Sequence, residues 1–250
     1  MNSIIIFPEE FTAQNLAVLR GVRAHYALQV HDLKVGLTVA AAKLGGERGR
    51  ASVKRADPQE VWLETDLTDA PFPVLPYELI VAVPRPQTVR KVAQIAATLG
   101  LSRVHIIRSA NVEKSYLSSR ALTPENLLAE GLKGLEQSGG SLLPEVMVHR
   151  RFRPFLEDYL SPRLGELKPA LKVVATPGAK CGIDSLKFSG GGCSKTALVA
   201  IGPESGWNNF EVLSFERLGF KQINLGVRIL RVESALIWLI AQLELLKDIS

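Results

Sequence analysis

Cysteine is scarce in this sequence, and its histidines are not clustered. Two cysteines among 250 residues, Cys181 and Cys193, cannot build a disulfide framework or a zinc ligand set. We expect both to be free thiols in a reducing compartment. The four histidines lack the spacing of metal ligands, and His105, inside an apolar run, is expected to be a core residue. The sequence therefore predicts no metal site.

Long hydrophobic runs and a basic leader are also absent. The longest apolar run near the end of the chain, Ala235 to Ala241, is far shorter than the ~20 residues that span a membrane. The first ten residues turn acidic after a short apolar stretch, unlike a signal peptide. We therefore expect no membrane partner and a cytoplasmic location.

The charge is moderate but unevenly distributed. The formal net charge is +5, with 46% hydrophobic and 22% charged residues, which excludes a disordered chain, a collagen and a coiled-coil rod. Residues 1–72 carry a net charge of −1 and residues 73–250 a net charge of +6. The basic part fits either an anionic partner such as nucleic acid or an ordinary solvated face, and charge alone leaves both open.

The first seventy residues contain short strand patterns separated by glycine turns. Strands are expected at 35–39, 51–54 and 60–64. Short strands at close spacing favour a small β-barrel. Pro71, Pro73 and Pro76 then make a stiff connector. We place the domain boundary there, giving domains 1–72 and 73–250.

After the connector, apolar strands alternate with helices. Residues 78–83 form a continuous apolar run, typical of a strand buried on both faces of its sheet. Further strands are expected at 103–107, 145–148, 171–175, 196–201 and 221–225. Helices are expected at 88–99, 125–136, 152–160 and 233–247, and another between the capping residue Asn208 and Gly219. This alternation predicts an α/β domain with a mostly parallel sheet.

Three of the predicted strands run directly into loops rich in glycine and proline, at 175–179, 200–207 and 225–234. Ligands bind α/β sheets at the carboxyl ends of strands, and glycine lets a backbone come close to a ligand. Ordinary tight turns are the alternative interpretation. The sequence has no dinucleotide or phosphate-loop motif, and we interpret Gly190–Lys195, which precedes a strand, as a surface loop.

Two of these loops carry a specific double motif. Ile201-Gly202-Pro203-Glu204-x-Gly206, followed by Leu225-Gly226-x-Arg228-Ile229-Leu230-Arg231-x-Glu233-Ser234-Ala235, resembles the signature of the RsmE family of SPOUT-class methyltransferases. The resemblance extends along the chain, since Arg23–Tyr26 with Val35-Gly36, and Glu136–Gly139 with Leu143–Val146, match other segments of that family.

The resemblance implies a fold and an activity. The activity is methylation of uridine N3 in bacterial small-subunit (16S) ribosomal RNA by S-adenosylmethionine, on the free RNA or the assembled small subunit. The implied fold is a PUA-like RNA-binding β-barrel followed by a SPOUT-type parallel sheet with a C-terminal trefoil knot. A homodimer with the cofactor in the knot loops is also implied.

The resemblance assigns the cofactor to the three strand-end loops. The residues expected to bind it are Thr176, Pro177, Gly178, Ile201, Gly202, Pro203, Gly206, Leu225, Gly226, Ile229, Leu230 and Arg231. One departure is Ser205, which stands where the family has the second glycine of Gly-Pro-Glu-Gly-Gly. A second is Asp32, where the family often has a basic residue.

Methylation at N3 requires removal of the N3 proton and stabilisation of the negative charge of the uracil anion. An arginine fork suits that charge, which makes Arg231, and then Arg228, the catalytic candidates. Glu204 and Glu233 are candidates for a base or for orienting an arginine. A surface ion pair remains the alternative for Arg228, and a carboxylate serving the helix dipole the alternative for Glu233.

RNA contacts are expected from the N-terminal domain, through Arg20 and Arg23. Three other functions stay open. The protein could be a noncatalytic RNA-binding protein that keeps the SPOUT fold, or a methyltransferase of another RNA. The third is a nucleotide-dependent α/β enzyme, which the missing phosphate loops disfavour.

Overall fold

The computed structural model describes residues 2–186 and 196–249. Cys193 and the Gly190–Lys195 loop lie outside the described residues. The chain divides into two compact units, one of Met1–Val74, Ala96–Gly100 and Leu128–Pro144, and the other of Leu75–Ile95, Leu101–Leu127 and Glu145–Ser250. We call them the first and the second unit.

The first unit contains a mixed sheet of six strands. Their order is β1 (Ser3–Ile6), β4 (Thr38–Lys43), β5 (Arg48–Ala56), β6 (Glu60–Asp69), β3 (Leu16–Arg20) and β2 (Phe11–Ala13). β1 and β4 run parallel, and the other neighbours are antiparallel. Aliphatic side chains from these strands, such as Ile4, Leu19, Val53 and Leu63, form its buried core.

One expectation for this unit was wrong, and one helix was not predicted. The pattern at 35–39 is not a strand throughout, because Gly36 makes a turn at φ +88° and β4 begins at Thr38. The sequence reasoning also missed helix α1 (Val22–His31), which follows Gly21. This helix buries only Ala24 and Ala27 among its own residues, so its apolar stripe is too thin to be recognised in the sequence.

The second unit is an α/β layer structure around an all-parallel sheet of six strands. Their order is β12 (Lys221–Ile223), β10 (Leu171–Ala175), β11 (Ala197–Ile201), β7 (Leu75–Ala82), β8 (Leu101–Ile107) and β9 (Glu145–His149). β7 lies between β11 and β8, and its residues from Tyr77 to Ala82 are all buried. The prediction of a parallel sheet buried on both faces is confirmed.

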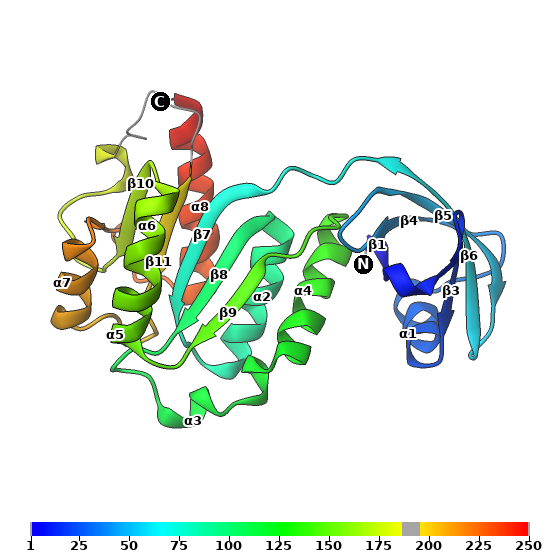
Figure 1. Ribbon diagram of the computed structural model, residues 1–250, viewed down its shortest axis with the longest axis horizontal. Coiled ribbons are helices and arrows are strands. Elements are labelled where there is room, and N and C mark those ends of the chain that lie inside the picture. Colours follow the sequence, from blue (N-terminus) through cyan, green and yellow to red (C-terminus); the bar gives the residue numbers. More distant parts are fainter. Residues whose placement is uncertain (1, 187–195, 250) are drawn as a thin grey trace. The chain divides into compact units, whose positions relative to one another are not determined.

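Helices cover both faces of this sheet (Figure 1). The long helices of this unit are α2 (Pro86–Leu99), α7 (Asn209–Arg217) and α8 (Val232–Ile249), and the short ones are α3 (Lys114–Leu117), α5 (Phe152–Pro154) and α6 (Ser161–Leu167). The end of α2 from Ala96, and α4 (Pro124–Ser138) from Leu128 onward, belong to the first unit. A π-helical segment, Phe155–Leu160, joins α5 to α6, so the helix expected at 152–160 continues to Leu167. Single 3-10 turns lie at Pro8–Glu10, Arg120–Leu122 and Ile183–Ser185.

The cap of α7 follows the sequence prediction. The Asn208 side chain accepts a bond from Glu211 N at 2.9 Å, and the Glu211 carboxylate accepts one from Asn208 N at 3.0 Å. Within the described residues, no helix is both long and apolar enough to cross a membrane.

Candidate active site

The loops that follow β10, β11 and β12 enclose a cavity of about 460 Å³. All six strands of the second unit are parallel, so their carboxyl ends share one edge of the sheet, where α/β proteins bind ligands. The strand order reverses between β7 and β11, which puts the cavity beside the switch point of the sheet.

Every residue assigned to the cofactor from the sequence lines this cavity. Four further lining residues, Ala175, Val227, Val232 and Ala235, were not predicted. Three of the four proposed catalytic residues, Arg228, Arg231 and Glu204, also line it, whereas Glu233 is not among the lining residues. The structure therefore brings together side chains that lie up to about sixty positions apart in the sequence.

The loop after β11 is a tight turn built on two glycines. Gly206 N donates to Pro203 O at 2.8 Å, and Gly206 has φ +75°, a conformation that favours glycine. A Cβ on Gly202 would lie 3.1 Å from Trp207 N, so a larger residue there would require the backbone of the loop to shift. The backbone of Ser205 is not left-handed, and its hydroxyl donates to Asn111 O at 3.3 Å. The turn tolerates a serine there because Gly206 takes the left-handed conformation.

Asn224 organises the loop after β12, and the sequence reasoning missed it. Its side-chain oxygen accepts a bond from Gly226 N at 3.1 Å, and its amide donates to Ala179 O at 2.6 Å. Its backbone N–H donates to Cys181 O at 2.8 Å. The asparagine thus ties the loop after β12 to the loop after β10. The spacing Asn-x-Gly, typical of an Asx turn, was the available sequence signal.

The two candidate arginines carry unpaired charges. Arg228 and Arg231 are both exposed, and the described residues offer neither of them an ion pair. Glu204 is exposed as well and accepts a bond from Arg85 N at 3.2 Å. Both guanidinium groups are therefore free to meet an anion at the mouth of the cavity.

Glu233 has a different environment. Its carboxylate accepts a bond from Lys91 Nζ at 2.9 Å, and it lies in the first turn of α8. The Lys91 bond, with help from the nearby charge of Arg231, holds the pKa of Glu233 below its usual range. A carboxylate that binds its proton so weakly makes a poor general base near neutral pH. This arrangement favours the helix-terminal role that the sequence left open.

Comparison with known proteins identifies the family. The model of the RNA methyltransferase domain family matches residues 70–244, which is well over half of the chain. The chain belongs to this family. A curated relative, ribosomal RNA small subunit methyltransferase E of Treponema pallidum (strain Nichols), is 28% identical over 238 residues, covering 93% of this chain and 87% of that protein. The enzyme of the same name from Mesomycoplasma hyopneumoniae (strain 232) is 24% identical over 164 residues, covering 66% of this chain and 67% of its own.

A solved structure shares the fold over nearly the full length. Ribosomal RNA small subunit methyltransferase E from Neisseria gonorrhoeae, bound to S-adenosylmethionine, superposes with a TM-score of 0.76 at 19% identity, covering 98% of both chains. The resemblance to the RsmE family that the double motif predicted is confirmed by these relatives.

In this family member, the two arginines expected to contact RNA lie in the first unit and carry acidic partners. Arg20 pairs with Glu60 at 3.1 Å and keeps 59% of its side chain exposed. Arg23 pairs with Glu10 at 3.0 Å, donates to Ile5 O and lies over the ring of Phe7. The guanidinium of Arg23 is thus committed to contacts inside its own unit, which favours a structural role.

The two matched family segments in the first unit meet in space. The Tyr26 hydroxyl donates to the Glu136 carboxylate at 2.7 Å, and His31 Nε2 lies 3.9 Å from the same carboxylate. Burial and the Glu136 carboxylate raise the pKa of Tyr26, so the phenol stays protonated. These family residues therefore stabilise the first unit, and none of them is among the residues that line the cavity.

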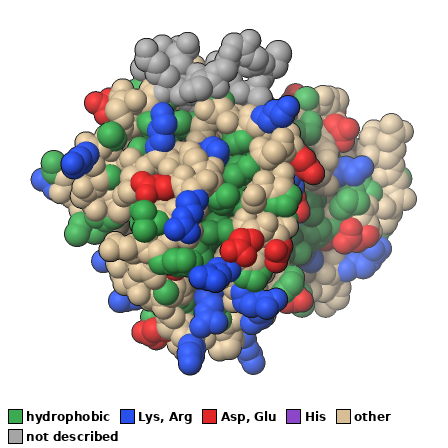
Figure 2. Space-filling view, turned by 60° about the vertical axis from the view of Figure 1, so that its left-hand side comes forward, with side chains coloured by type: hydrophobic (Ala, Val, Ile, Leu, Met, Phe, Trp, Pro, Cys, Tyr) green, Lys and Arg blue, Asp and Glu red, His purple; other side chains and the backbone are tan. Residues whose placement is uncertain are grey.

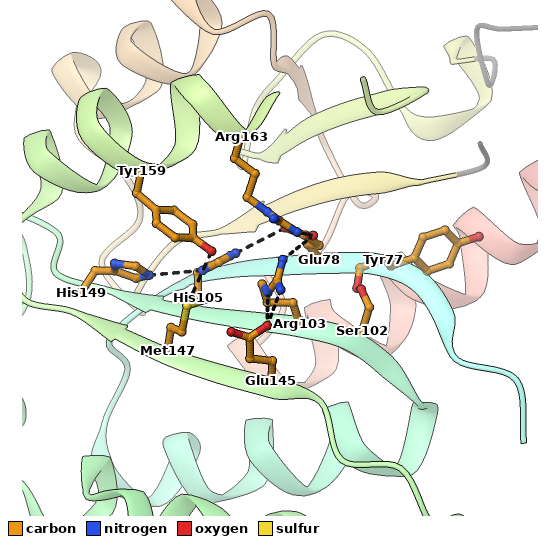
Figure 3. A network of polar contacts seen from close by, with 10 residues as sticks. All are labelled: Tyr77, Glu78, Ser102, Arg103, His105, Glu145, Met147, His149, Tyr159 and Arg163. Carbon is orange, nitrogen blue, oxygen red and sulfur yellow. Dashed lines mark hydrogen bonds and ion pairs between the residues drawn. The ribbon is translucent and has the colours of Figure 1, made fainter. Parts of the chain in front are cut away.

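A buried polar network crosses β7, β8 and β9 in the second unit (Figure 3). Glu78 is only 3% exposed, and its Oε1 accepts a bond from Arg103 at 3.2 Å. Its Oε2 accepts a bond from Arg163 Nε at 3.1 Å and lies 3.4 Å from His105 Nε2. His105 is fully buried, as expected, and its Nδ1 lies 3.2 Å from His149 Nε2. Burial, and then the neighbouring His105, lower the pKa of His149 to about 4. Because Arg163 lies on α6, the network holds that helix to the sheet.

Proposed function

We propose that this protein transfers the methyl group of S-adenosylmethionine to N3 of a uridine in small-subunit (16S) ribosomal RNA. The observation that carries this proposal is the cavity at the sheet edge, where three glycine-containing loops and two unpaired arginines meet in a member of an RNA methyltransferase family. The names of the curated relatives, both small-subunit ribosomal RNA methyltransferases, support the substrate class.

The residues of the cavity fit the cofactor. A volume of about 460 Å³ lies within the range of small-molecule sites. Thr176 in its wall has a buried hydroxyl without a hydrogen-bond partner among the described residues, which a polar ligand group can satisfy. Aliphatic side chains such as Ile201, Leu225 and Leu230 provide an apolar surface for the base of a nucleoside. The cofactor would supply a methyl group activated by its positive sulfur.

The protein's own contribution is alignment and charge. The three loops would hold the donor methyl and the uridine nitrogen in line, which replaces a bimolecular encounter by a positioned one. We assign Arg231 to the anionic uracil, whose charge lies on the carbonyl oxygens beside N3, and Arg228 as the second donor. Glu204, at the cavity mouth, is then the carboxylate best placed to take the N3 proton, and Glu233 positions Lys91 and the helix end.

Finer features of the fold are part of the same proposal. We infer a trefoil knot formed by the loops around the cavity, and a PUA-like barrel formed by the mixed sheet of the first unit. We keep domains 1–72 and 73–250 as the proposed division, with the methyl transfer in the second. Of the two arginines expected to contact RNA in the first domain, Arg20 is exposed enough to do so, while Arg23 is held by Glu10. Activity on ribosomal RNA would also place the protein in the cytoplasm.

A homodimer is supported by the exposed apolar face of α8. Ile237, Trp238 and Leu245 lie on one side of this helix and expose about half of their surface or more. Val227 and Ile229, next to the cavity, are exposed as well. An apolar stripe of this kind marks a protein interface more often than a solvated face, and a second copy would cover it beside the cofactor loops.

The decisive experiment is methylation with labelled cofactor. The full chain would be incubated with labelled S-adenosylmethionine and with small subunits, or their RNA, from cells that lack this modification. Label at one uridine, with a stop in primer extension caused by the blocked pairing edge, is the expected result. Cofactor binding without labelled RNA would favour a noncatalytic RNA-binding protein, and stronger labelling of another RNA would overturn the substrate assignment.

A further inference from the structure

Five arginines follow the three strands of the second unit that do not contribute to the cavity. Arg85 follows β7, Arg108 follows β8, and Arg150, Arg151 and Arg153 follow β9. All five are exposed. We call them the arginine surface. Figure 2 shows Lys and Arg side chains gathered at the bottom of this face of the molecule.

The backbone holds these segments side by side. Val83 N donates to Ile107 O at 2.8 Å, and Arg108 N donates to His149 O at 3.0 Å. Because neighbouring strands lie ~5 Å apart, the three segments occupy a strip about 10 Å wide at the edge of the sheet. The segment after β8 is fixed further, since Glu211 accepts a bond from Ala110 N at 2.7 Å.

The charges of the arginine surface are not neutralised inside the protein. Among the described residues, none of these five arginines forms an ion pair, although Glu113 and Glu157 lie on the same segments. Arg150 donates to Leu117 O, at 3.4 Å. Arg153 lies 5.1 Å above the ring of Phe210, a side chain with 44% of its surface exposed.

The basic residues of the first unit behave differently. Most of them have an acidic partner, including Lys34 with Asp32 at 2.8 Å, and Lys54 with Glu64 at 2.7 Å. Arg55 pairs with Asp57 at 2.6 Å. The unpaired positive charge is therefore concentrated in the second unit. The segment of Arg85 lies next to the cavity, because its backbone N–H donates to Glu204, which lines the cavity.

We propose that the arginine surface binds the phosphate backbone of the substrate RNA and leads the target nucleotide into the neighbouring cavity. Guanidinium groups without internal partners are suited to phosphate, because one guanidinium can donate two parallel hydrogen bonds to two phosphate oxygens. The exposed ring of Phe210 beside Arg153 offers a stacking platform for an unpaired base, as in recognition of single-stranded RNA. This inference rests on the proposed function, because it takes RNA as the substrate.

The test compares two triple variants of the full chain. In one, Arg150→Gln, Arg151→Gln and Arg153→Gln remove three charges from the arginine surface. In the matched control, Lys34→Gln, Lys54→Gln and Arg55→Gln remove three exposed charges from the first unit. The affinity for a small-subunit RNA fragment is measured across a salt series, and the affinity for S-adenosylmethionine by calorimetry.

We expect the first triple variant to bind RNA at least tenfold more weakly than the wild type, with a salt slope smaller by about 2, since each lost phosphate contact removes ~0.7 to 0.9. Its cofactor affinity should not change. The control should bind RNA within about threefold of the wild type, and Phe210→Ala should bind at least about fivefold more weakly, as expected for loss of a stacking platform.

The outcomes separate this inference from the proposed function. Wild-type RNA affinity in the first triple variant, with normal cofactor binding, overturns the arginine surface and leaves the proposed function standing. A larger loss in the control than in the first variant also overturns it, and assigns the RNA to the first unit. Failure of the wild-type protein to bind either S-adenosylmethionine or RNA overturns the proposed function itself.

Discussion

Gly226 offers a way to separate backbone strain from contact with the cofactor. Its φ is +117°, and a Cβ built there meets no protein atom within 4 Å. In Gly226→Ala, backbone strain is therefore the main cost to folding, about 1–2 kcal/mol. Strain would also disturb the bond that Gly226 N donates to Asn224 at 3.1 Å, and with it the loop that lines the cavity.

Gly36 is the matched control for this substitution. It has φ +88°, a Cβ there also meets nothing within 4 Å, and it lies in the first unit. Gly36→Ala and Gly226→Ala should lower the free energy of unfolding by similar amounts. Only Gly226→Ala should weaken S-adenosylmethionine binding, by tenfold or more, which is about 1.4 kcal/mol. The bulkier Gly226→Val should weaken it at least as much.

Calorimetric titration and thermal unfolding of the same samples decide between these effects. Unchanged cofactor affinity in Gly226→Val would refute the assignment of the cavity to the cofactor. Equal loss of affinity in Gly36→Ala would mean that general destabilisation, and not the loop, sets the affinity.

The other predictions concern catalysis, pH and assembly. Arg231→Lys and Arg231→Ala should each lower the single-turnover rate about a hundredfold or more, with little change in the affinity for the cofactor. Higher pH should partly restore the rate of Arg231→Ala, because hydroxide then forms the uracil anion. A cofactor affinity that falls in step with the rate would contradict this prediction. His149 has a pKa of about 4 when folded and ~6.5 when unfolded, so the unfolded state binds more protons and stability should fall by about 1–2 kcal/mol from pH 7 to 5. His149→Gln should reduce that slope in urea unfolding at the two pH values, and an unchanged slope would contradict the assignment. If the proposed homodimer forms through α8, Trp238→Glu should convert it to monomers in analytical ultracentrifugation, and a dimer that persists would exclude α8 as the interface.

The sheet and cavity of the second unit could be predicted because their signals are local. A strand buried on both faces needs a continuous apolar run, and Glu78–Val83 is such a run apart from its first residue. A tight loop next to a ligand needs glycine, and Gly206 and Gly226 do have positive φ values. Each of these signals involves only a few neighbouring positions of the chain, so it can be recognised in a single sequence.

The first unit was harder to predict because its determinants are distant or weak. Helix α1 buries only small alanines, which give too little apolar periodicity to recognise. Its Tyr26 bonds to Glu136, which is 110 positions away. A partner so distant in the chain cannot be predicted from the residue types or the spacing within one segment.

The roles of charged residues were the hardest to predict, because they depend on which charge lies opposite in space. Glu233 was a candidate base in the sequence, and Lys91, 142 positions away, makes it a stable carboxylate instead. Arg23 and Arg153 look alike in the sequence, yet Arg23 is neutralised by Glu10 while Arg153 has no acidic partner among the described residues. Net charge per segment misses this difference, since an internally paired arginine adds little to the field that attracts RNA. Unpaired charge at the carboxyl edge of a parallel sheet is the more informative quantity, and it directs the search for the RNA site to the loops after β7, β8 and β9.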